Sequence, residues 1–261
     1  ICHVQIQITM LSLLYLCFSI LIMYTESTAS ESRVFNGENL RPNVHRYLVE
    51  LHMTPFIDGP WSCSGSVINQ HWIISSAHCF HTPAMVVAMQ NVEQIRRVVT
   101  HGIPSKVVTY PGYNFDGDDS AGNTEKDLAL IKMDKTMVFD DWLQPISLSV
   151  QSIKIGQEVI VAGYGETEPG NSVPREGSTV VSPCNVGSGY KIICTNGLVH
   201  SGHGDSGGPL VSEGRLVGVT SSGCVEVVNE KCETIYANVA DSNHCDFVSR
   251  NLYVSSSLTI R

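Results

Sequence analysis

The densest chemical signal in this sequence is a serine placed on a glycine-rich turn. Residues 204–210 read Gly-Asp-Ser-Gly-Gly-Pro-Leu. Because the neighbouring glycines lack side chains, the backbone N–H groups of Gly204 and Ser206 can point at one spot, where they would stabilise a developing oxyanion. Ser206 is then the candidate nucleophile of an acyl transfer, and a plain glycine turn between two strands is the alternative.

A candidate base and a candidate carboxylate precede this serine. His78 stands at the end of an apolar strand, and Asp127 opens the apolar run Asp-Leu-Ala-Leu-Ile-Lys. A carboxylate at the mouth of a buried strand is desolvated and can accept a proton from the imidazole. Alone, His78 would be an ordinary surface or core histidine and Asp127 a turn residue. Together with Ser206 they predict a catalytic triad.

Short strands must position these residues, because apolar or alternating runs broken by turn residues recur along the chain. The predicted strands are Tyr47–Leu51, His71–Ser75, Ile95–Val99, Lys106–Tyr110, Leu128–Met133, Glu158–Ala162, Ser178–Val181, Tyr190–Cys194, Pro209–Val211, Arg215–Ser221 and Thr234–Val239. Such a pattern favours an all-β fold of antiparallel barrels or sandwiches over a βαβ fold. Glu213 and Gly214 predict a tight hairpin, and residues 133–145 are the expected connection between two lobes.

Only the C-terminal tail has helical periodicity. Cys245, Val248 and Leu252 fall on one face at three- and four-residue spacing, and either Asp241 or Ser242 can cap the helix. The sequence therefore predicts one terminal helix after the strands.

Composition and charge exclude some classes of partner. The chain has 261 residues, is 43% hydrophobic, contains 22 Gly and 11 Pro, and carries a formal charge of −9. These values describe a turn-rich globular protein. Nucleic acids and anionic membranes are not expected partners, because both require clustered Lys and Arg.

The first 29 residues read as upstream sequence followed by a secretion signal. Leu11–Tyr24 has the length of an apolar signal core, and Ser27–Ala29 offers small residues for cleavage. Met10 is the expected start, so residues 1–9 are not expected in the expressed protein. A short membrane anchor is the alternative, although a relaxed span needs roughly 20 residues. We expect an extracellular protein with no membrane attachment after processing.

Seven of the nine cysteines follow this expected signal. Secretion would expose them to an oxidising compartment, where they should pair. An odd number leaves one thiol that is free, buried or intermolecular, and arithmetic alone does not say which one.

The chain order His78, Asp127, Ser206, with the motifs around them, resembles the trypsin/chymotrypsin family of serine proteases. The resemblance implies an all-β fold of two packed six-stranded antiparallel β-barrels with a C-terminal helix. The two barrel lobes would span about residues 34–140 and 141–240. His78 and Asp127 would belong to the first barrel and Ser206 to the second.

Residues 33–37, Arg-Val-Phe-Asn-Gly, resemble the activation junction of this family, which is usually a basic residue followed by Ile-Val-Gly-Gly. Phe35 and Asn36 depart from that pattern. The resemblance implies a short activation propeptide at residues 30–33 and a serine protease domain at residues 34–261.

Cleavage after Arg33 by a trypsin-like protease would release a new α-amino group at Val34. Its ammonium would pair with Asp205, and this buried ion pair would order the oxyanion loop. An α-amino group has a reference pKa of about 7.7 to 8.0, so deprotonation at high pH would break the pair. The resemblance thus predicts a zymogen.

Specificity in this family depends largely on the residue six positions before the nucleophile, which here is His200. Binding of Lys or Arg needs an acid at that position, so cleavage after basic residues is not expected. A histidine can hydrogen-bond an acidic or polar side chain, or it can merely fill a degenerate pocket. Ser222 replaces a common tryptophan, and Thr234 replaces a glycine. The expected pocket residues are His200, Ser201, Ser221, Ser222, Gly223 and Thr234.

One disulfide of the family pattern is missing, because Gly202 stands where a cysteine is usual. The loss frees Cys224 to pair with Cys232 across a short loop. Cys245 is left over, either as a buried thiol or as a dimer link. The implied disulfides are Cys63–Cys79, Cys184–Cys194 and Cys224–Cys232.

The resemblance implies a secreted serine endopeptidase that cleaves proteins or peptides through an acyl-enzyme, with protease inhibitors as further partners. The alternative is a secreted homologue with little or no turnover that acts as a binding or competitor protein, which would explain the unusual pocket. A monomer without a cofactor is expected. His78 and His81 have a metal-like spacing, but zinc there would compete with the triad, so no metal site is expected.

Overall fold

The parts of the chain that the computed structural model describes are residues 34–41, 43–56, 59–92, 95–116, 121–165, 173–185, 191–224, 227–228 and 231–257. They all belong to one compact unit, Glu31–Arg261. The expected signal at residues 1–29 and the expected propeptide with Arg33 lie outside the described residues. Among the described helices, none has both the length and the apolar character to cross a membrane.

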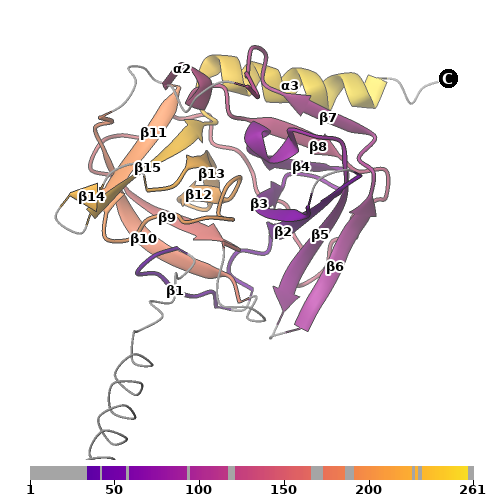
Figure 1. Cartoon of the computed structure of the whole chain (residues 1–261), viewed down its shortest axis with the longest axis horizontal. Helices are drawn as coiled ribbons and strands as arrows, with labels where there is room; N and C mark the ends of the chain where they lie inside the picture. The colour runs from indigo at the N-terminus through magenta and orange to yellow at the C-terminus, as the bar shows by residue number, and fades with distance from the viewer. Residues whose placement is uncertain are drawn as a thin grey trace, which may run out of the picture. The chain divides into compact units, whose positions relative to one another are not determined.

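Seven antiparallel strands form the N-terminal sheet, drawn in purple in Figure 1. In spatial order they are β6 (Ile95–Gly102), β5 (Ala84–Val92), β2 (Leu48–Pro55), β3 (Trp61–Val67), β4 (Trp72–Ser75), β8 (Ala129–Lys132) and β7 (Lys106–Thr109). The two edge strands are consecutive in the chain, since only residues 103–105 separate β6 from β7. The sheet is therefore a half-barrel whose two edges are joined by the chain itself.

Six strands of the C-terminal sheet close into an antiparallel barrel. In order around the barrel they are β9 (Glu158–Gly163), β10 (Arg175–Ser182), β11 (Ile192–Gly197), β15 (Lys231–Asn238), β13 (Arg215–Ser222) and β12 (Pro209–Ser212). β12 pairs again with β9, which closes the ring. Two short strands, β1 (Glu38–Asn39) and β14 (Val227–Val228), extend it at β10 and β15. The predicted fold of two antiparallel barrels with a C-terminal helix is confirmed, with one difference: the C-terminal barrel has the predicted six strands, whereas the N-terminal sheet has seven and is a half-barrel.

The predicted hairpin lies between β12 and β13. Glu213 and Gly214 have positive φ angles of 50° and 71°, and Ser212 pairs directly with Arg215. Two successive left-handed residues match the right-handed twist of the flanking strands. This tight turn carries the chain from the strand that follows the Ser206 turn into β13.

Apolar side chains form a core inside each curved sheet and a further core between the two sheets. Val49, Leu51 and Met53 alternate along β2 and are fully buried in the core of the N-terminal sheet, as the period of a strand requires. A second cluster contains both Leu130 of β8 and Val219 of β13. The two sheets thus share a core, which fixes the strand ends that carry the candidate site.

The terminal helix α3 (Ser242–Ser257) is capped by Asp241 and not by Ser242. The Asp241 carboxylate accepts the N–H groups of the second and third helical residues at 3.0 and 3.4 Å. On the predicted apolar face, Val248 is buried and Leu252 packs against the core that the two sheets share.

Two short helices were not predicted. They are the 3₁₀ helix η1 (Ala77–Phe80) and α2 (Ala121–Thr124). Four residues are too few to show a 3.6-residue period in the sequence.

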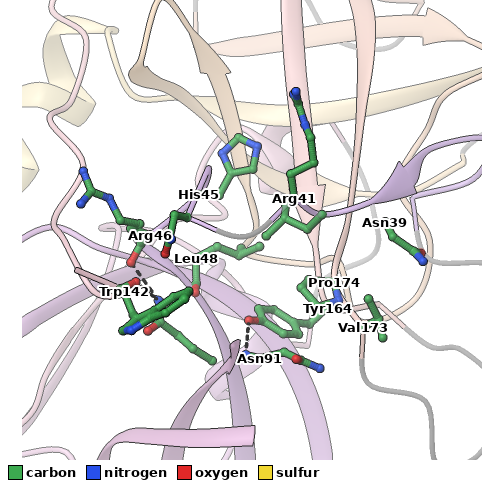
Figure 2. Close-up of a pocket in the computed structure, with 13 residues that line it drawn as sticks. Asn39, Arg41, His45, Arg46, Leu48, Asn91, Trp142, Tyr164, Val173 and Pro174 are labelled. Carbon is green, nitrogen blue, oxygen red and sulfur yellow. Dashed lines mark hydrogen bonds between the residues drawn. The ribbon is translucent and has the colours of Figure 1, made fainter. Parts of the chain in front are cut away.

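A cavity of about 360 Å³ lies where the segment before β2 meets the ends of β5 and β9 (Figure 2). His45 lines it, with Nδ1 at 2.6 Å from the Tyr47 hydroxyl and Nε2 at 2.8 Å from Glu176 Oε2. Burial lowers the pKa of His45, although Glu176 acts in the opposite direction. Burial also raises the pKa of Tyr47, so its hydroxyl keeps the proton that it donates to the neutral ring. This chain of polar groups ties the N-terminal segment to β10.

Acidification is expected to destabilise the fold through His45. Because its pKa is lowered in the folded state, the unfolded state binds more protons, and stability falls as the pH drops below about 6.5. His45→Gln removes this titration and can still donate to Glu176. Thermal melting between about pH 5 and pH 7 should therefore depend less on pH in the variant. An identical pH dependence in both proteins would contradict the prediction.

Candidate active site

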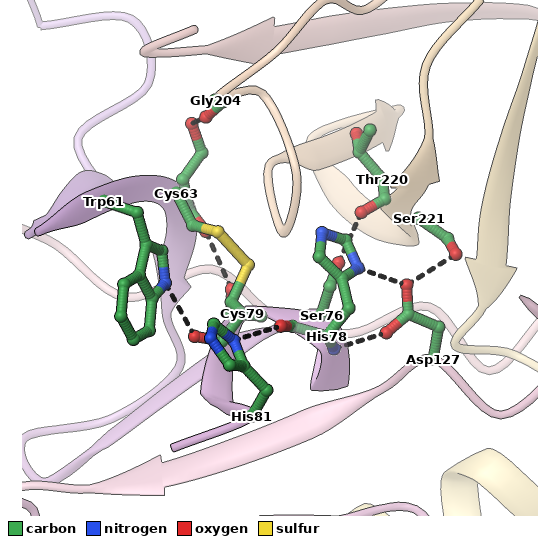
Figure 3. The surroundings of a disulfide bond; sticks show 12 residues. Trp61, Cys63, Ser76, His78, Cys79, His81, Asp127, Gly204, Thr220 and Ser221 are labelled. Carbon is green, nitrogen blue, oxygen red and sulfur yellow. Dashed lines mark hydrogen bonds and ion pairs between the residues drawn. A yellow bond between two sulfur atoms is a disulfide. The ribbon is translucent and has the colours of Figure 1, made fainter. Parts of the chain in front are cut away.

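The carboxylate of Asp127 gathers three donors. Asp127 is 3% exposed and precedes β8. Its Oδ1 accepts the backbone N–H of His78 at 2.9 Å, and its Oδ2 lies 2.7 Å from His78 Nδ1 and 2.6 Å from the Ser221 hydroxyl (Figure 3). Because an ionised carboxylate only accepts, Nδ1 carries the proton, and the lone pair of the neutral ring is on Nε2. The ring is held in the tautomer that a general base needs.

The role of Ser221 was not found from the sequence. The resemblance places this residue in the specificity pocket, and the structure in addition directs its hydroxyl to Asp127. Ser221 is a polar residue near the end of β13 and carries no motif of its own. The contact spans 94 positions in the chain and has no local signal.

Strand β3 connects the Ser206 turn to His78. The N–H of Ser64 donates to the backbone carbonyl of Ser206 at 2.8 Å. The preceding residue, Cys63, forms a disulfide with Cys79, which directly follows His78. Strand β3 is thus hydrogen-bonded to the backbone of the candidate nucleophile and disulfide-bonded to the residue that follows the candidate base.

The carbonyl of Thr220 is a second shared anchor. It accepts the N–H of Gly207 at 2.8 Å and the hydroxyl of Ser76 at 2.5 Å. Gly207 has a φ of 80°, and an added Cβ would overlap the carbonyl oxygen of Ser64. Glycine is therefore required here both by backbone conformation and by space. The turn after Ser206 and the segment before His78 meet on one strand, β13.

Two amides of the Ser206 turn are left without an acceptor among the described residues. The N–H groups of Asp205, Gly207 and Gly208 donate to backbone carbonyls at 3.2, 2.8 and 2.8 Å. The N–H groups of Gly204 and Ser206 have no such partner within the described part of the chain. These are the two amides that the sequence predicts for an oxyanion hole, and Gly204 has the positive φ, 83°, that glycine tolerates.

Asp205 receives the segment that begins at Val34. Asp205 is fully buried; its Oδ2 lies 3.0 Å from Val34 N and 2.9 Å from Gly202 N, and its Oδ1 lies 2.8 Å from Gly165 N. In the intact chain the Val34 nitrogen is an amide. Val34 is fully buried and has a φ of 32°, which is strained for a β-branched residue.

Three of the predicted pocket residues, Ser201, Gly223 and Thr234, lie close together. Ser201 and Thr234 are fully buried, and the Ser201 N–H donates to Thr234 Oγ1 at 3.3 Å. Ser222 and Gly223 are half-buried at the end of β13. A Cβ added at Gly223 would lie only 3.1 Å from the carbonyl oxygen of Ser201. Residues 201 and 223 leave little width between them.

His200 stacks on Phe35, a contact that sequence reasoning missed. Their ring centroids are 4.5 Å apart, with an angle of 17° between the planes. The Phe35 N–H donates to the His200 carbonyl at 2.8 Å, and His200 Nδ1 lies 3.2 Å from the carbonyl of Ser201. One face of the imidazole is therefore covered by protein. The only sequence signal was that Phe35 departs from the family pattern.

The three implied disulfides are present in the structure. They are Cys63–Cys79, Cys184–Cys194 and Cys224–Cys232. Cys245 is a free thiol, half-buried on α3. The sulfur atoms of Cys63 and Cys79 lie within 4.8 Å of a His78 nitrogen, but the disulfide removes the thiolates that a metal would need.

Sequence comparisons agree with this arrangement. The model of the Trypsin family matches residues 34–245. Trypsin-2 from Salmo salar is 28% identical over 208 residues, which cover 74% of this chain and 86% of the relative. Trypsin from Sus scrofa is 28% identical over 213 residues, with coverage of 75% and 87%.

The fold is similar to that of a solved structure, described as neuropsin, a serine protease expressed in the limbic system of mouse brain. The TM-score is 0.66 at 18% sequence identity, and the match covers 83% of this chain and 99% of the other. The likeness supports the assignment of the fold, with its two barrel-like sheets and terminal helix.

Proposed function

The chain belongs to the trypsin family of serine proteases, and we propose that it is a secreted serine endopeptidase that hydrolyses peptide bonds through an acyl-enzyme. The observation that carries this proposal is the 2.7 Å pairing of His78 Nδ1 with the buried Asp127 carboxylate, in a segment that shares its anchors on β3 and β13 with the glycine turn of Ser206. Substrates are proteins or peptides, and protease inhibitors are further partners of the same site.

In the proposed reaction, Ser206 Oγ attacks the scissile carbonyl while His78 Nε2 takes its proton. The Gly204 and Ser206 amides stabilise the oxyanion of the tetrahedral intermediate. His78 then donates the proton to the leaving amine, which departs and leaves the acyl-enzyme. Water next attacks the acyl carbonyl while His78 takes its proton, and His78 returns that proton to Ser206 Oγ as the acid product leaves. Asp127 holds the ring and stabilises the imidazolium.

The protein is proposed to be made as a zymogen, with a signal up to residue 29, a propeptide at 30–33 and a protease domain at 34–261. A trypsin-like protease cleaves after Arg33. The cut replaces a neutral Val34 amide by an ammonium at a position 3.0 Å from Asp205. The cut also relieves the strained φ of Val34. This dihedral angle includes the carbonyl carbon of residue 33, which is no longer bonded to the Val34 nitrogen after cleavage.

Cleavage after Lys or Arg is not part of the proposal. The residue at the base of the predicted pocket is His200, and no carboxylate replaces the missing acid at that position. Three disulfides support a secreted, extracellular protein, because such bonds persist in oxidising compartments. We propose that the protein acts as a monomer.

One observation favours the second candidate function, a homologue with little turnover that acts as a binding or competitor protein. The close approach of Gly223 to the Ser201 carbonyl leaves little width between the walls. A pocket that narrow would still let a protein bind across the cleft while slowing the chemistry of most substrates.

Labelling with a fluorophosphonate probe tests the proposal. The probe reacts with an activated serine and needs the nucleophile, the base and the oxyanion hole together. Protein that begins at Val34 should be labelled, whereas protein that retains residues 30–33 and the Ser206→Ala variant should not. If correctly cleaved wild-type protein stays unlabelled, the binding-protein function replaces the endopeptidase.

A further inference from the structure

The three residues that follow the expected cleavage site, Val34, Phe35 and Asn36, lie along residues 198–205, which include His200 and Ser201 of the predicted pocket. The Asn36 side chain donates to the Leu198 carbonyl at 2.8 Å, the Phe35 N–H to the His200 carbonyl at 2.8 Å, and the Val34 N–H to Asp205 at 3.0 Å. Three successive residues are thus bonded to the segment 198–205, and Phe35 is bonded to the pocket residue His200 itself.

Phe35 occupies the space in which a side chain at position 202 would lie. A Cβ added at Gly202 would be 2.9 Å from Cε2 and 3.4 Å from Cδ2 of the Phe35 ring. At that separation the Phe35 ring would have to shift to admit any residue larger than glycine at position 202. The two departures from the family pattern, at positions 35 and 202, are therefore packed against each other.

The ring also supports the wall from the side of His200. It stacks on His200 and lies against Gly202, while Gly202 and Ser201 approach Gly223 on the facing wall. A Cβ at Gly223 would lie 3.1 Å from the Ser201 carbonyl and 3.9 Å from the Gly202 Cα. No long side chain fits between these two backbones unless one of them moves.

We propose that Phe35 is a specificity-determining residue of the proposed endopeptidase. By filling the space beside Gly202 and stacking on His200, its ring holds residues 200–202 close to Gly223. The pocket then accepts only a small side chain, that of Gly, Ala or Ser, on the acyl side of the scissile bond. Phe35 acts through the wall and is a positioning residue that does not touch the reacting atoms. This inference rests on the proposed function.

The first test compares peptide substrates on protein that begins at Val34. For the wild type, kcat/KM should be higher with Ala than with Leu or Phe on the acyl side. Phe35→Val should shift that ratio by about tenfold or more toward the larger residues, because the wall can then retreat. Phe56→Val is the matched control, since Phe56 is 73% exposed. An unchanged ratio in Phe35→Val overturns the proposal.

The second test does not depend on activity and uses the full chain. Gly202→Ala should lower the Tm strongly in the wild-type background and only slightly in the Phe35→Val background, since the clash is then gone. Gly59→Ala is the matched glycine control, because an added Cβ there meets nothing within 4 Å. Equal Tm shifts for Gly202→Ala in both backgrounds overturn the proposal.

The two tests separate this inference from the proposed function. If the wild type is labelled by the fluorophosphonate but shows no preference for small residues, the proposed endopeptidase function stands and the specificity role of Phe35 is overturned. A wild type that is not labelled loses both, even if the Tm shifts show that Phe35 and Gly202 are packed as described.

Discussion

Replacing Asp127 by Asn is expected to lower the kcat of the activated protein by about 10⁴-fold, a magnitude taken from related proteases with the same three residues. Asp127 accepts from His78 Nδ1 at 2.7 Å and from Ser221 at 2.6 Å. An amide can accept through its oxygen but also presents N–H groups, which would turn the ring to the tautomer that has no lone pair on Nε2. The three side chains would keep their positions, but His78 Nε2 could no longer accept the proton of Ser206.

Steady-state hydrolysis of a peptide substrate measures this loss in kcat, with the Tm recorded to show that the variant is folded. Asp246→Asn is the control, because Asp246 is an exposed carboxylate on α3 paired with Arg250 at 2.9 Å. Its kcat should not change. A fall of less than tenfold in Asp127→Asn would remove Asp127 from the triad.

Asp205→Asn is expected to cost about 10²- to 10³-fold in activity after cleavage at Arg33. Asp205 holds Val34, Gly202 and Gly165 through its two oxygens. A neutral amide cannot pair with the Val34 ammonium, so the turn between Gly204 and Ser206 loses the contact that orders it. Losing one oxyanion donor typically costs a factor in this range.

The pH profile distinguishes this mechanism from a general loss of structure. Pairing raises the pKa of the α-ammonium above its reference value of about 7.7 to 8.0, so the active arrangement is present below that range and is lost as the pH rises through the paired pKa. Wild-type activity should therefore fall at alkaline pH, and Asp205→Asn should lack this fall. The same alkaline fall in the variant would assign it to another group.

Patterns within short stretches of sequence predicted those elements that are determined by neighbouring residues. The period-2 runs gave most strands, Glu213 and Gly214 gave the hairpin, and Asp241 was one of two predicted caps for α3. Residue types and their order predicted His78 as the base and Asp127 as its carboxylate partner, and in the structure His78 Nδ1 lies 2.7 Å from Asp127 Oδ2. These predictions depend on a few neighbouring residues. The predicted strands are found at their places with different ends, and β3 and β5 were not among them.

Contacts between distant segments could not be predicted in the same way. The Ser221 hydroxyl reaches Asp127 across 94 positions, and Phe35 stacks on His200 from the other end of the chain. Phe35 and Gly202 could each be recognised from the sequence as unusual. Their packing against each other, with only 2.9 Å between a Cβ at position 202 and the Phe35 ring, arises only in the fold.

The burial of Val34 has a consequence for the speed of the proposed activation. Val34 is fully buried, and Gly37 donates to its carbonyl at 2.8 Å to close a turn. A protease needs the residues on both sides of its target bond extended in its own cleft, so the segment must leave the wall before it can be cut. In the proposed activation, the cutting enzyme would compete with residues 198–205 for Val34, Phe35 and Asn36. The lag before activity develops is then set by how often the segment opens locally, and more of the activating enzyme shortens it only until opening becomes limiting.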